Sequence, residues 1–277
     1  MKNPILASMS LFQKIEAKKS LGQHFLNNPH VPTLMAESAH LSEGEVVVEI
    51  GPGTGVLTKA LLDAGASVVA LEADRRAIEA LESTFSDEIT SGKLVLIHTD
   101  VRDFDPRTLG FGRGTYKVVA NIPYYLSGRL FRIFLESETH PSDLVFLVQK
   151  EVAERIARDK KESILSLSVK VFGEPLYIKT IGKGNFSPAP KVDSAIIAVR
   201  NISHDSLLKV GVSFFFEILH LGFASKRKQL LGNLSKQFDR EKLVHIFSTL
   251  ELPLDVRGED VSVSKWLELV IELRKLG

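Results

Sequence analysis

Glu49-Ile50-Gly51-Pro52-Gly53-Thr54-Gly55 is the most informative stretch of this 277-residue sequence, because it joins an apolar run to a segment of helical periodicity. A strand, a glycine-rich turn and a helix, in this order, bind nucleotides in doubly wound α/β folds. The three glycines follow a G-x-G-x-G spacing, whereas dinucleotide-binding loops follow G-x-G-x-x-G. A cradle for a pyrophosphate is therefore disfavoured at this turn.

Short apolar runs alternate with helical segments around and after this turn. Strands are predicted at residues 46–50, 67–71, 94–98, 116–120 and 143–148. Such alternation indicates right-handed βαβ units and a Rossmann-like α/β fold with a doubly wound, mainly parallel sheet. Residues 175–181 and 192–199, joined by a loop rich in glycine and proline, are predicted as an antiparallel pair at the sheet edge.

The rest of the chain is predicted to be helical. A polar segment at 201–206 is typical of a linker, and helices are predicted at 207–221, 226–236, 240–250 and 263–275. Single hydrophobic cores rarely grow past about 250 residues. We therefore expect two domains, an α/β domain over 1–202 and a small all-helical domain over 203–277.

The composition argues against several classes of protein. No apolar run reaches the roughly 18 residues that a membrane-spanning helix requires. The sequence has no cysteine and no two histidines four residues apart, so a metal site is not expected. The 35 basic and 34 acidic residues nearly cancel, and any argument for a nucleic-acid partner must be local. We expect a cytoplasmic, metal-free monomer that does not act at a membrane.

Four successive predicted strands end at, or are followed by, a glycine or a polar residue: Gly51, Glu72, Asp100 and Asn121. Because the carboxyl ends of parallel strands meet at one edge of a sheet, we expect these residues to line one crevice. Glu72 can accept hydrogen bonds from a ribose diol, and Asp100 can accept from an adenine amino group. Each residue alone is equally well explained as a surface turn or a helix cap. The ordered set predicts a site for S-adenosylmethionine.

Asn121-Ile122-Pro123-Tyr124, after the fourth predicted strand, suits the methylation of an aromatic amine. Such an amine is a poor nucleophile because its lone pair is delocalised into the ring. If the Asn121 oxygen and the Ile122 carbonyl accept its two N–H bonds, the nitrogen can pyramidalise and localise the lone pair. Pro123 stiffens the turn, and Tyr124 offers a face on which a base can stack. The alternative is an ordinary strand-to-loop turn.

A second aromatic residue, Phe186, lies in the predicted loop before the last strand. It could contact the other face of an extruded base, as enzymes that modify bases require. Alternatively it is a packing residue, which is the commoner role of a phenylalanine near prolines.

These motifs, together with Gln23-His24-Phe25-Leu26, Gln149-Lys150-Glu151-Val152 and residues 186–194, resemble the KsgA/RsmA family of ribosomal RNA adenine dimethyltransferases. The resemblance runs from about Leu21 to the C-terminus. It implies dimethylation of two adjacent adenines near the 3′ end of the small-subunit (16S) rRNA during ribosome biogenesis, with S-adenosylmethionine as the methyl donor. It also implies that an immature small subunit is the partner.

The resemblance carries roles to individual residues of this sequence. It implies cofactor contacts at His24, Leu26, Gly51, Glu72, Asp100 and Asn121, and it places Asn121, Pro123, Tyr124 and Phe186 around the reacting amine. Three positions depart from the family pattern. His24 and Tyr125 each stand where the family often has asparagine, and Glu162-Ser163-Ile164-Leu165-Ser166 replaces a frequent Tyr-Gly-x-Leu-Ser.

The C-terminal domain separates the small-subunit enzymes from relatives that methylate large-subunit rRNA. Residues 224–234 resemble the small-subunit enzymes and include Lys226, Arg227 and Lys228, which we predict to contact RNA phosphates. Between His220 and His245 there are six basic residues and two acidic ones, a local excess that suits phosphate contacts. The alternative is a solvated helix face.

Two other functions remain open at this point. The chain could be a ribosome-assembly or transcription factor that retains the fold without the chemistry, although the intact Asn121–Tyr124 motif argues against this. It could also methylate a small molecule or a protein amine, because the tetrapeptide by itself specifies only a planar amine.

Overall fold

The structure is a computed structural model that describes residues 15–18, 22–225 and 228–276. The chain forms two compact units, Met1–Ala153 with Leu176–Ile202, and Glu154–Pro175 with Ser203–Gly277. The predicted first domain spans 1–202, whereas the structure places Glu154–Pro175 in the second unit. This segment joins the second unit because Phe172 stacks on Phe216 at a centroid distance of 6.2 Å.

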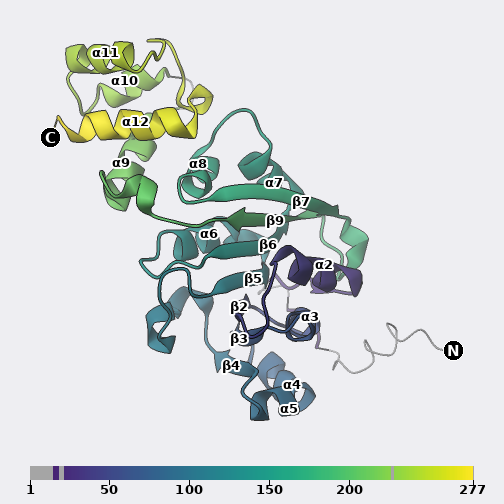
Figure 1. The fold of residues 1–277 in the computed structure, drawn as a ribbon. Helices are drawn as coiled ribbons and strands as arrows, with labels where there is room; N and C mark the ends of the chain where they lie inside the picture. Colours follow the sequence, from purple (N-terminus) through teal and green to yellow (C-terminus); the bar gives the residue numbers. More distant parts are fainter. Residues whose placement is uncertain (1–14, 19–21, 226–227, 277) are drawn as a thin grey trace. The chain divides into compact units, whose positions relative to one another are not determined.

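The first unit is built on a seven-stranded sheet with the strand order β4-β3-β2-β5-β6-β9-β7. Its strands are β2 (Val46–Ile50), β3 (Ser67–Glu72), β4 (Leu94–His98), β5 (Lys117–Asn121), β6 (Asp143–Gln149), β7 (Glu174–Ile181) and β9 (Ser194–Arg200). The pairs from β4 through β6 are parallel, and β9 is antiparallel to β6. This confirms the predicted fold class of a mainly parallel sheet with an antiparallel edge (Figure 1).

Helices cover both faces of this sheet, which explains why its central strands are continuously apolar. Val145 and Leu147 of β6 join a core cluster that also contains Met35 and Leu61. The intervening Phe146 packs against Phe131, with ring centroids 5.1 Å apart. The helices of this unit are α2 (His30–Ser38), α3 (Val56–Asp63), α4 (Arg75–Thr84), α5 (Ser86–Thr90), α6 (Ser127–Leu135) and the start of α7 (Lys150–Ala157).

A second, two-stranded sheet was not predicted. Its strands, β1 (Phe25–Leu26) and β8 (Phe186–Ser187), pair antiparallel, with Leu26 opposite Phe186. Two residues are too few to produce an alternating pattern in the sequence. The pair brings the segment before α2 to the loop before β9.

The second unit is helical, as expected. It contains α8 (Ile164–Lys170), α9 (Val212–Gly222), α10 (Leu230–Leu234), α11 (Arg240–Thr249) and α12 (Val263–Arg274). Trp266 is fully buried, stacks on Phe223 at 5.7 Å, and donates from Nε1 to the Gly258 carbonyl at 3.1 Å. The helix predicted to begin at 207 begins at Val212, because Gly211 has a φ of 80° and a ψ of 146°. No helix in the part of the chain that the structure describes is long and apolar enough to span a membrane.

Candidate functional site

A cavity lies at the carboxyl ends of the parallel strands. Most of the predicted site residues line it: His24, Gly51, Glu72, Asp100, Asn121, Pro123 and Tyr124. Parallel pairing of β2 with β3 and β5, and of β3 with β4, brings the ends of these strands to the same edge of the sheet. The predicted crevice is therefore present as a single cavity.

The glycine-rich turn forms one wall of this cavity. Gly51, Gly53 and Gly55 all have positive φ values, of 64°, 54° and 85°, which glycine adopts without steric cost. A Cβ atom at Gly51 would meet nothing within 4 Å, whereas one at Gly53 would lie 2.8 Å from Phe25 Cε1. The open space at Gly51 leaves room for a ligand beside the backbone.

Glu72, at the end of β3, is 5% exposed. Its Oε1 accepts a hydrogen bond from the Asp74 amide at 2.8 Å, and its Oε2 accepts one from the Gly53 amide at 3.1 Å. Burial raises the pKa of this carboxyl. Each carboxylate oxygen has a further lone pair, so Glu72 can still accept from a ligand diol.

Asp74 was not among the predicted residues. It caps the N-terminus of α4 and forms an ion pair with Arg76 at 2.6 Å. The hydrogen bond from Arg76 lowers the pKa of Asp74 to about 2. The Asp74 side chain therefore remains charged at neutral pH. Separately, the Asp74 backbone amide helps to fix Glu72 by donating to its carboxylate.

Asp100 lines the cavity, with a side chain that is 27% exposed. It accepts from the backbone amide of Arg102 at 2.9 Å and pairs with its guanidinium at 2.5 Å. The bond from the Arg102 side chain lowers the pKa of Asp100. Asp100 therefore caps the short 3₁₀ turn Val101–Asp103, as the alternative of a helix cap predicted, and it also lines the cavity.

Asn121 is the last residue of β5, and its side chain has a fixed orientation. Its Nδ2 donates to the His24 carbonyl at 3.1 Å. With the amide nitrogen engaged, the side-chain oxygen is the group left to accept from a ligand amine. Ile122 is buried and its amide donates to the Leu147 carbonyl at 3.3 Å, which fixes the backbone beside Asn121.

Tyr124 is partly buried beside this turn. Its hydroxyl is 2.6 Å from the Ser194 hydroxyl, and its ring stacks on the His24 ring with centroids 5.7 Å apart. His24 Nδ1 lies 2.7 Å from the Pro188 carbonyl oxygen. Burial raises the pKa of Tyr124, so the phenol is neutral at physiological pH. His24 and Ser194 thus hold the ring in place from two sides.

Phe186 and Leu26 are not among the described residues that line the cavity. They are 3% and 5% exposed and belong to the core cluster of the first unit. Their pairing in the two-stranded sheet turns both side chains into the interior. Phe186 is therefore a packing residue in this structure, which was the alternative predicted from the sequence. Its buried ring is not available to contact the second face of an extruded base.

Glu49 was part of the quoted motif but was not predicted as a site residue. Its side chain is completely buried, and neither carboxyl oxygen has a partner within hydrogen-bonding geometry among the described residues. Burial raises its pKa to about 8, although the nearby Thr58 opposes part of that rise. A glutamate within the otherwise apolar run Val46–Ile50 was the sequence signal that could have found it.

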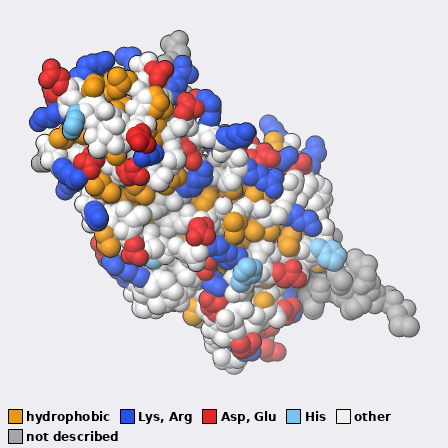
Figure 2. Space-filling model, turned by 45° about the horizontal axis from the view of Figure 1, so that its top comes forward, with side chains coloured by type: hydrophobic (Ala, Val, Ile, Leu, Met, Phe, Trp, Pro, Cys, Tyr) orange, Lys and Arg blue, Asp and Glu red, His pale blue; other side chains and the backbone are white. Residues whose placement is uncertain are grey.

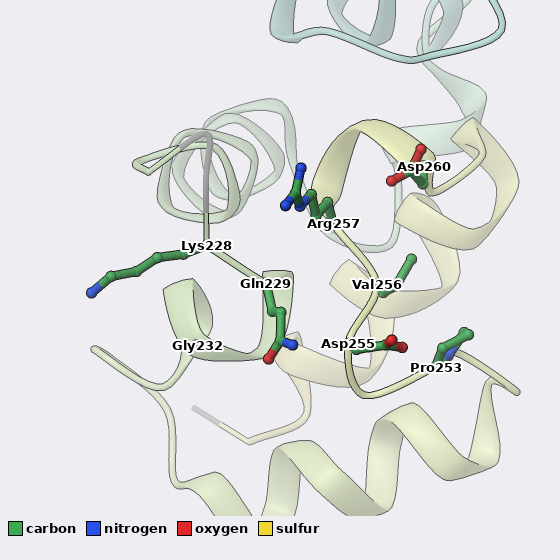
Figure 3. A pocket seen from close by; sticks show the side chains of 8 residues that line it. All are labelled: Lys228, Gln229, Gly232, Pro253, Asp255, Val256, Arg257 and Asp260. Carbon is green, nitrogen blue, oxygen red and sulfur yellow. The ribbon is translucent and has the colours of Figure 1, made fainter.

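The second unit carries the predicted RNA-binding residues. Lys226 and Arg227 lie outside the described residues, and Lys228 lines a groove of about 800 Å³. Figure 3 shows that the groove lies between the segment before α10 and the loop after α11, which contributes Asp255 and Arg257. The Leu230 amide donates to the Val256 carbonyl at 2.8 Å and joins the two segments.

The charge on this groove is mixed, because Asp255 and Asp260 accompany Lys228 and Arg257. Figure 2 likewise shows basic and acidic side chains interspersed over the visible face. Among the described residues, no cluster of three or more histidine, aspartate or glutamate side chains could hold a metal ion.

The comparisons with known proteins agree with this geometry. A family model described as "Ribosomal RNA adenine dimethylase" matches residues 14–275. The chain belongs to this family. Proteins named "Ribosomal RNA small subunit methyltransferase A" from Dehalococcoides mccartyi and Thermosynechococcus vestitus are each 35% identical to it. The alignments cover 93% and 95% of this chain and 89% and 98% of the relatives.

Two solved structures share the fold of this chain. A dimethyladenosine transferase from Plasmodium falciparum superposes with a TM-score of 0.76 at 24% identity, over 91% of this chain and 98% of the other. The 23S rRNA methyltransferase ErmE superposes with a TM-score of 0.71 at 23% identity, over 90% of this chain and 99% of the other. The matching family model and the relatives at 35% identity confirm the family resemblance expected from the sequence motifs.

Proposed function

We propose that this chain transfers methyl groups from S-adenosylmethionine to the N6 amines of two adjacent adenosines near the 3′ end of small-subunit rRNA. The observation that carries the proposal is the position of Asn121-Ile122-Pro123-Tyr124 at the end of β5, on the wall of the cavity, in a member of the ribosomal RNA adenine dimethylase family. The proposed partner is rRNA in an immature small subunit, met in the cytoplasm by a monomer.

The residues around the cavity fit S-adenosylmethionine. The open space at Gly51 accommodates a ligand against the backbone, Glu72 retains lone pairs for a ribose diol, and Asp100 can accept from an adenine amino group. His24 and Asn121 line the same cavity. When bound, the cofactor supplies an electrophilic methyl group on a sulfonium.

The amine is activated by the acceptors of the tetrapeptide. The Asn121 oxygen and the Ile122 carbonyl accept the two N–H bonds of adenine N6, so the nitrogen lone pair is localised and directed at the methyl carbon. With the cofactor bound, a nitrogen–carbon bond would form as the carbon–sulfur bond of the sulfonium broke, and the cationic amine held by Asn121 and Ile122 would lose its proton to water. Tyr124, held by Ser194 and His24, provides the stacking face for the adenine.

The helical unit is proposed to position the protein on structured RNA. Lys226, Arg227 and Lys228 contact phosphates, which orient a protein on nucleic acid without reading its sequence. Arg257, which lines the same groove as Lys228, adds a positive charge there.

The test is methylation of immature small subunits by the purified chain with methyl-labelled cofactor. We expect the label in the 3′-terminal part of the rRNA, and N6,N6-dimethyladenosine in the nucleoside digest by mass spectrometry. Unlabelled rRNA, under conditions in which a family relative labels it, would overturn the proposal. If Asn121→Ala abolished methylation and left every cellular phenotype intact, the non-enzymatic assembly role would gain support as the role that matters in the cell.

A further inference from the structure

Tyr125 directly follows the tetrapeptide and has an unusual environment for an aromatic residue. Its side chain is 66% exposed, and it lines the mouth of the candidate cavity in the turn Tyr124–Leu126. Among the described residues, no other phenylalanine, tyrosine or tryptophan is classed as exposed. Exposing a ring of this size forgoes the stabilisation that burial would give. Packing within the first unit therefore does not account for the residue.

The Tyr125 ring is supported on one side. A Cβ atom built on Gly22 would lie 3.0 Å from Cε1 and 3.2 Å from Cδ1 of Tyr125, so the ring rests against the Gly22 backbone. Gly22 has a φ of 60°, in the left-handed region that favours glycine. Because residue 22 is a glycine, no side chain occupies the space next to the Tyr125 ring. The opposite side of the ring is left to solvent.

Two arginines lie near Tyr125, one lining the cavity and one on α6. Arg102 lines the same cavity as Tyr125, with a side chain that is 49% exposed. Arg129, on the exposed side of α6, is close enough to contribute to the lowered pKa of Asp100. An exposed ring with flanking guanidinium groups is the arrangement that binds single-stranded nucleic acid, through base stacking and phosphate contacts.

The other aromatic residues near the cavity are already engaged. Tyr124 is held by Ser194 and His24 and is assigned to the target base, Phe25 packs against the Gly53 backbone, and Phe186 is buried in the core. A nucleotide next to the target in the RNA chain must leave the cavity at its rim, where Tyr125 stands. In a pair of adjacent adenosines, that neighbour is the other methylation target.

We propose that Tyr125 is a stacking platform for the base adjacent to the adenosine in the cavity, with Arg102 and Arg129 near the connecting phosphates. The inference rests on the proposed function, and it makes Tyr125 a positioning residue for the RNA strand. Base–aromatic stacking tolerates any base, so the platform can accept either adenosine while the other is methylated.

The test compares Tyr125→Ala with Tyr125→Phe in methylation of immature small subunits. We expect Tyr125→Ala to raise the KM for subunits roughly 5- to 150-fold, the range for loss of one stacked base. Tyr125→Phe keeps the ring and should stay within about 2-fold of the wild type. The cofactor Kd should be unchanged in both variants, because the ring stacks on RNA. Leu208→Ala, which removes a 74% exposed side chain of the second unit, is the control.

A second measurement does not require turnover. An RNA hairpin with two adjacent loop adenines carries 2-aminopurine in place of either one, and binding is followed by fluorescence. Wild type and Tyr125→Phe should give the same change in fluorescence on binding. Tyr125→Ala should lose this change when 2-aminopurine replaces the adenine next to the one in the cavity. An active Tyr125→Ala variant with unchanged KM and fluorescence would overturn the platform and leave the proposed function intact. Equal losses in cofactor and RNA affinity would also overturn it, and an inactive wild type that binds no RNA would overturn both proposals.

Discussion

At the scale of single residues, Tyr124 combines two roles that substitutions can separate. Tyr124→Phe removes only the hydroxyl that meets Ser194, whereas Tyr124→Ala also removes the ring that stacks on His24. We expect Tyr124→Ala to lower kcat on small subunits about 10- to 100-fold, because the adenine loses its stacking face. The cofactor Kd, measured by calorimetry, should change far less. Tyr124→Phe should lose less than Tyr124→Ala, and equal losses of kcat and cofactor affinity would show that the ring is structural.

Glu49 gives the free energy of unfolding a predictable pH dependence. Its pKa is raised from 4.5 to about 8 in the folded chain, so the folded state binds the proton more tightly than the unfolded state. Between these two pH values the unfolded chain releases the proton first, and stability must fall as the pH rises. The stabilisation is therefore greatest below pH 4.5 and declines up to about pH 8.

Glu49→Gln should remove this dependence, because an amide does not ionise. In urea unfolding of the cofactor-free protein from pH 5 to 8.5, we expect the variant to lose less stability than the wild type, by on the order of 3 kcal/mol. Glu82→Gln, a change of an exposed glutamate on α4, is the matched control and should follow the wild type. Parallel curves for wild type and Glu49→Gln would show that Glu49 is already charged in the fold.

At the scale of elements, the glycine-rich turn predicts different effects for two chemically identical substitutions. Alanine at Gly55 would place its Cβ 2.6 Å from Phe85 and 2.8 Å from Leu81, at a φ of 85°. We expect this change to destabilise the fold by about 2 kcal/mol or more. Alanine at Gly51 meets nothing within 4 Å, so its cost is limited to backbone strain of about 1 kcal/mol.

The Gly51 variant should instead lose cofactor affinity, because its methyl group occupies the space proposed for the ligand. Thermal unfolding and calorimetry with S-adenosylmethionine would separate the two effects. Gly44→Ala, at a φ of 74° with nothing within 4 Å, reports the strain alone. Unchanged cofactor binding in Gly51→Ala would remove this turn from the proposed site.

Elements with strong periodicity could be predicted from the sequence, and those set by tertiary contacts could not. The strand predicted at 67–71 is observed as Ser67–Glu72, because apolar residues buried between two helical layers leave an unambiguous run. The β1–β8 pair, with two residues per strand, left no pattern. Phe186 was expected at the site from its predicted loop position and from the family resemblance, but it is buried and pairs with Leu26. Likewise, the helix predicted over 226–236 is observed only as Leu230–Leu234, with Lys226 and Arg227 outside the described residues.

The site itself could be predicted where residues are carried by the strands. Gly51, Glu72, Asp100 and Asn121 meet at one cavity because parallel strands share a carboxyl edge. The contacts between loops left no such signal. The bond from Asn121 to the His24 carbonyl joins residues 97 positions apart, and no local pattern in the sequence encodes it.

At the scale of the whole molecule, chemistry and docking are proposed to reside in different compact units, and this division predicts separable defects. Replacing Lys226, Arg227 and Lys228 together by alanine removes three positive charges from the helical unit. We expect weaker binding to immature small subunits, and a plot of log affinity against log salt concentration with a slope shallower by about 2 to 3, roughly one per lost phosphate contact. Cofactor affinity and thermal stability should be unchanged, because the substitutions lie outside the first unit, which contains the seven-stranded sheet.

The matched control removes the same charge from the sheet unit, by alanine at Lys59, Arg75 and Lys93. Non-specific attraction to RNA depends on total charge, so a general electrostatic effect would change both triple variants equally. Docking through the helical unit requires that the first variant lose far more affinity than the control. If filter binding over a salt series gave the two variants the same slope, the basic segment would be a solvated surface and another part of the molecule would have to contact the rRNA.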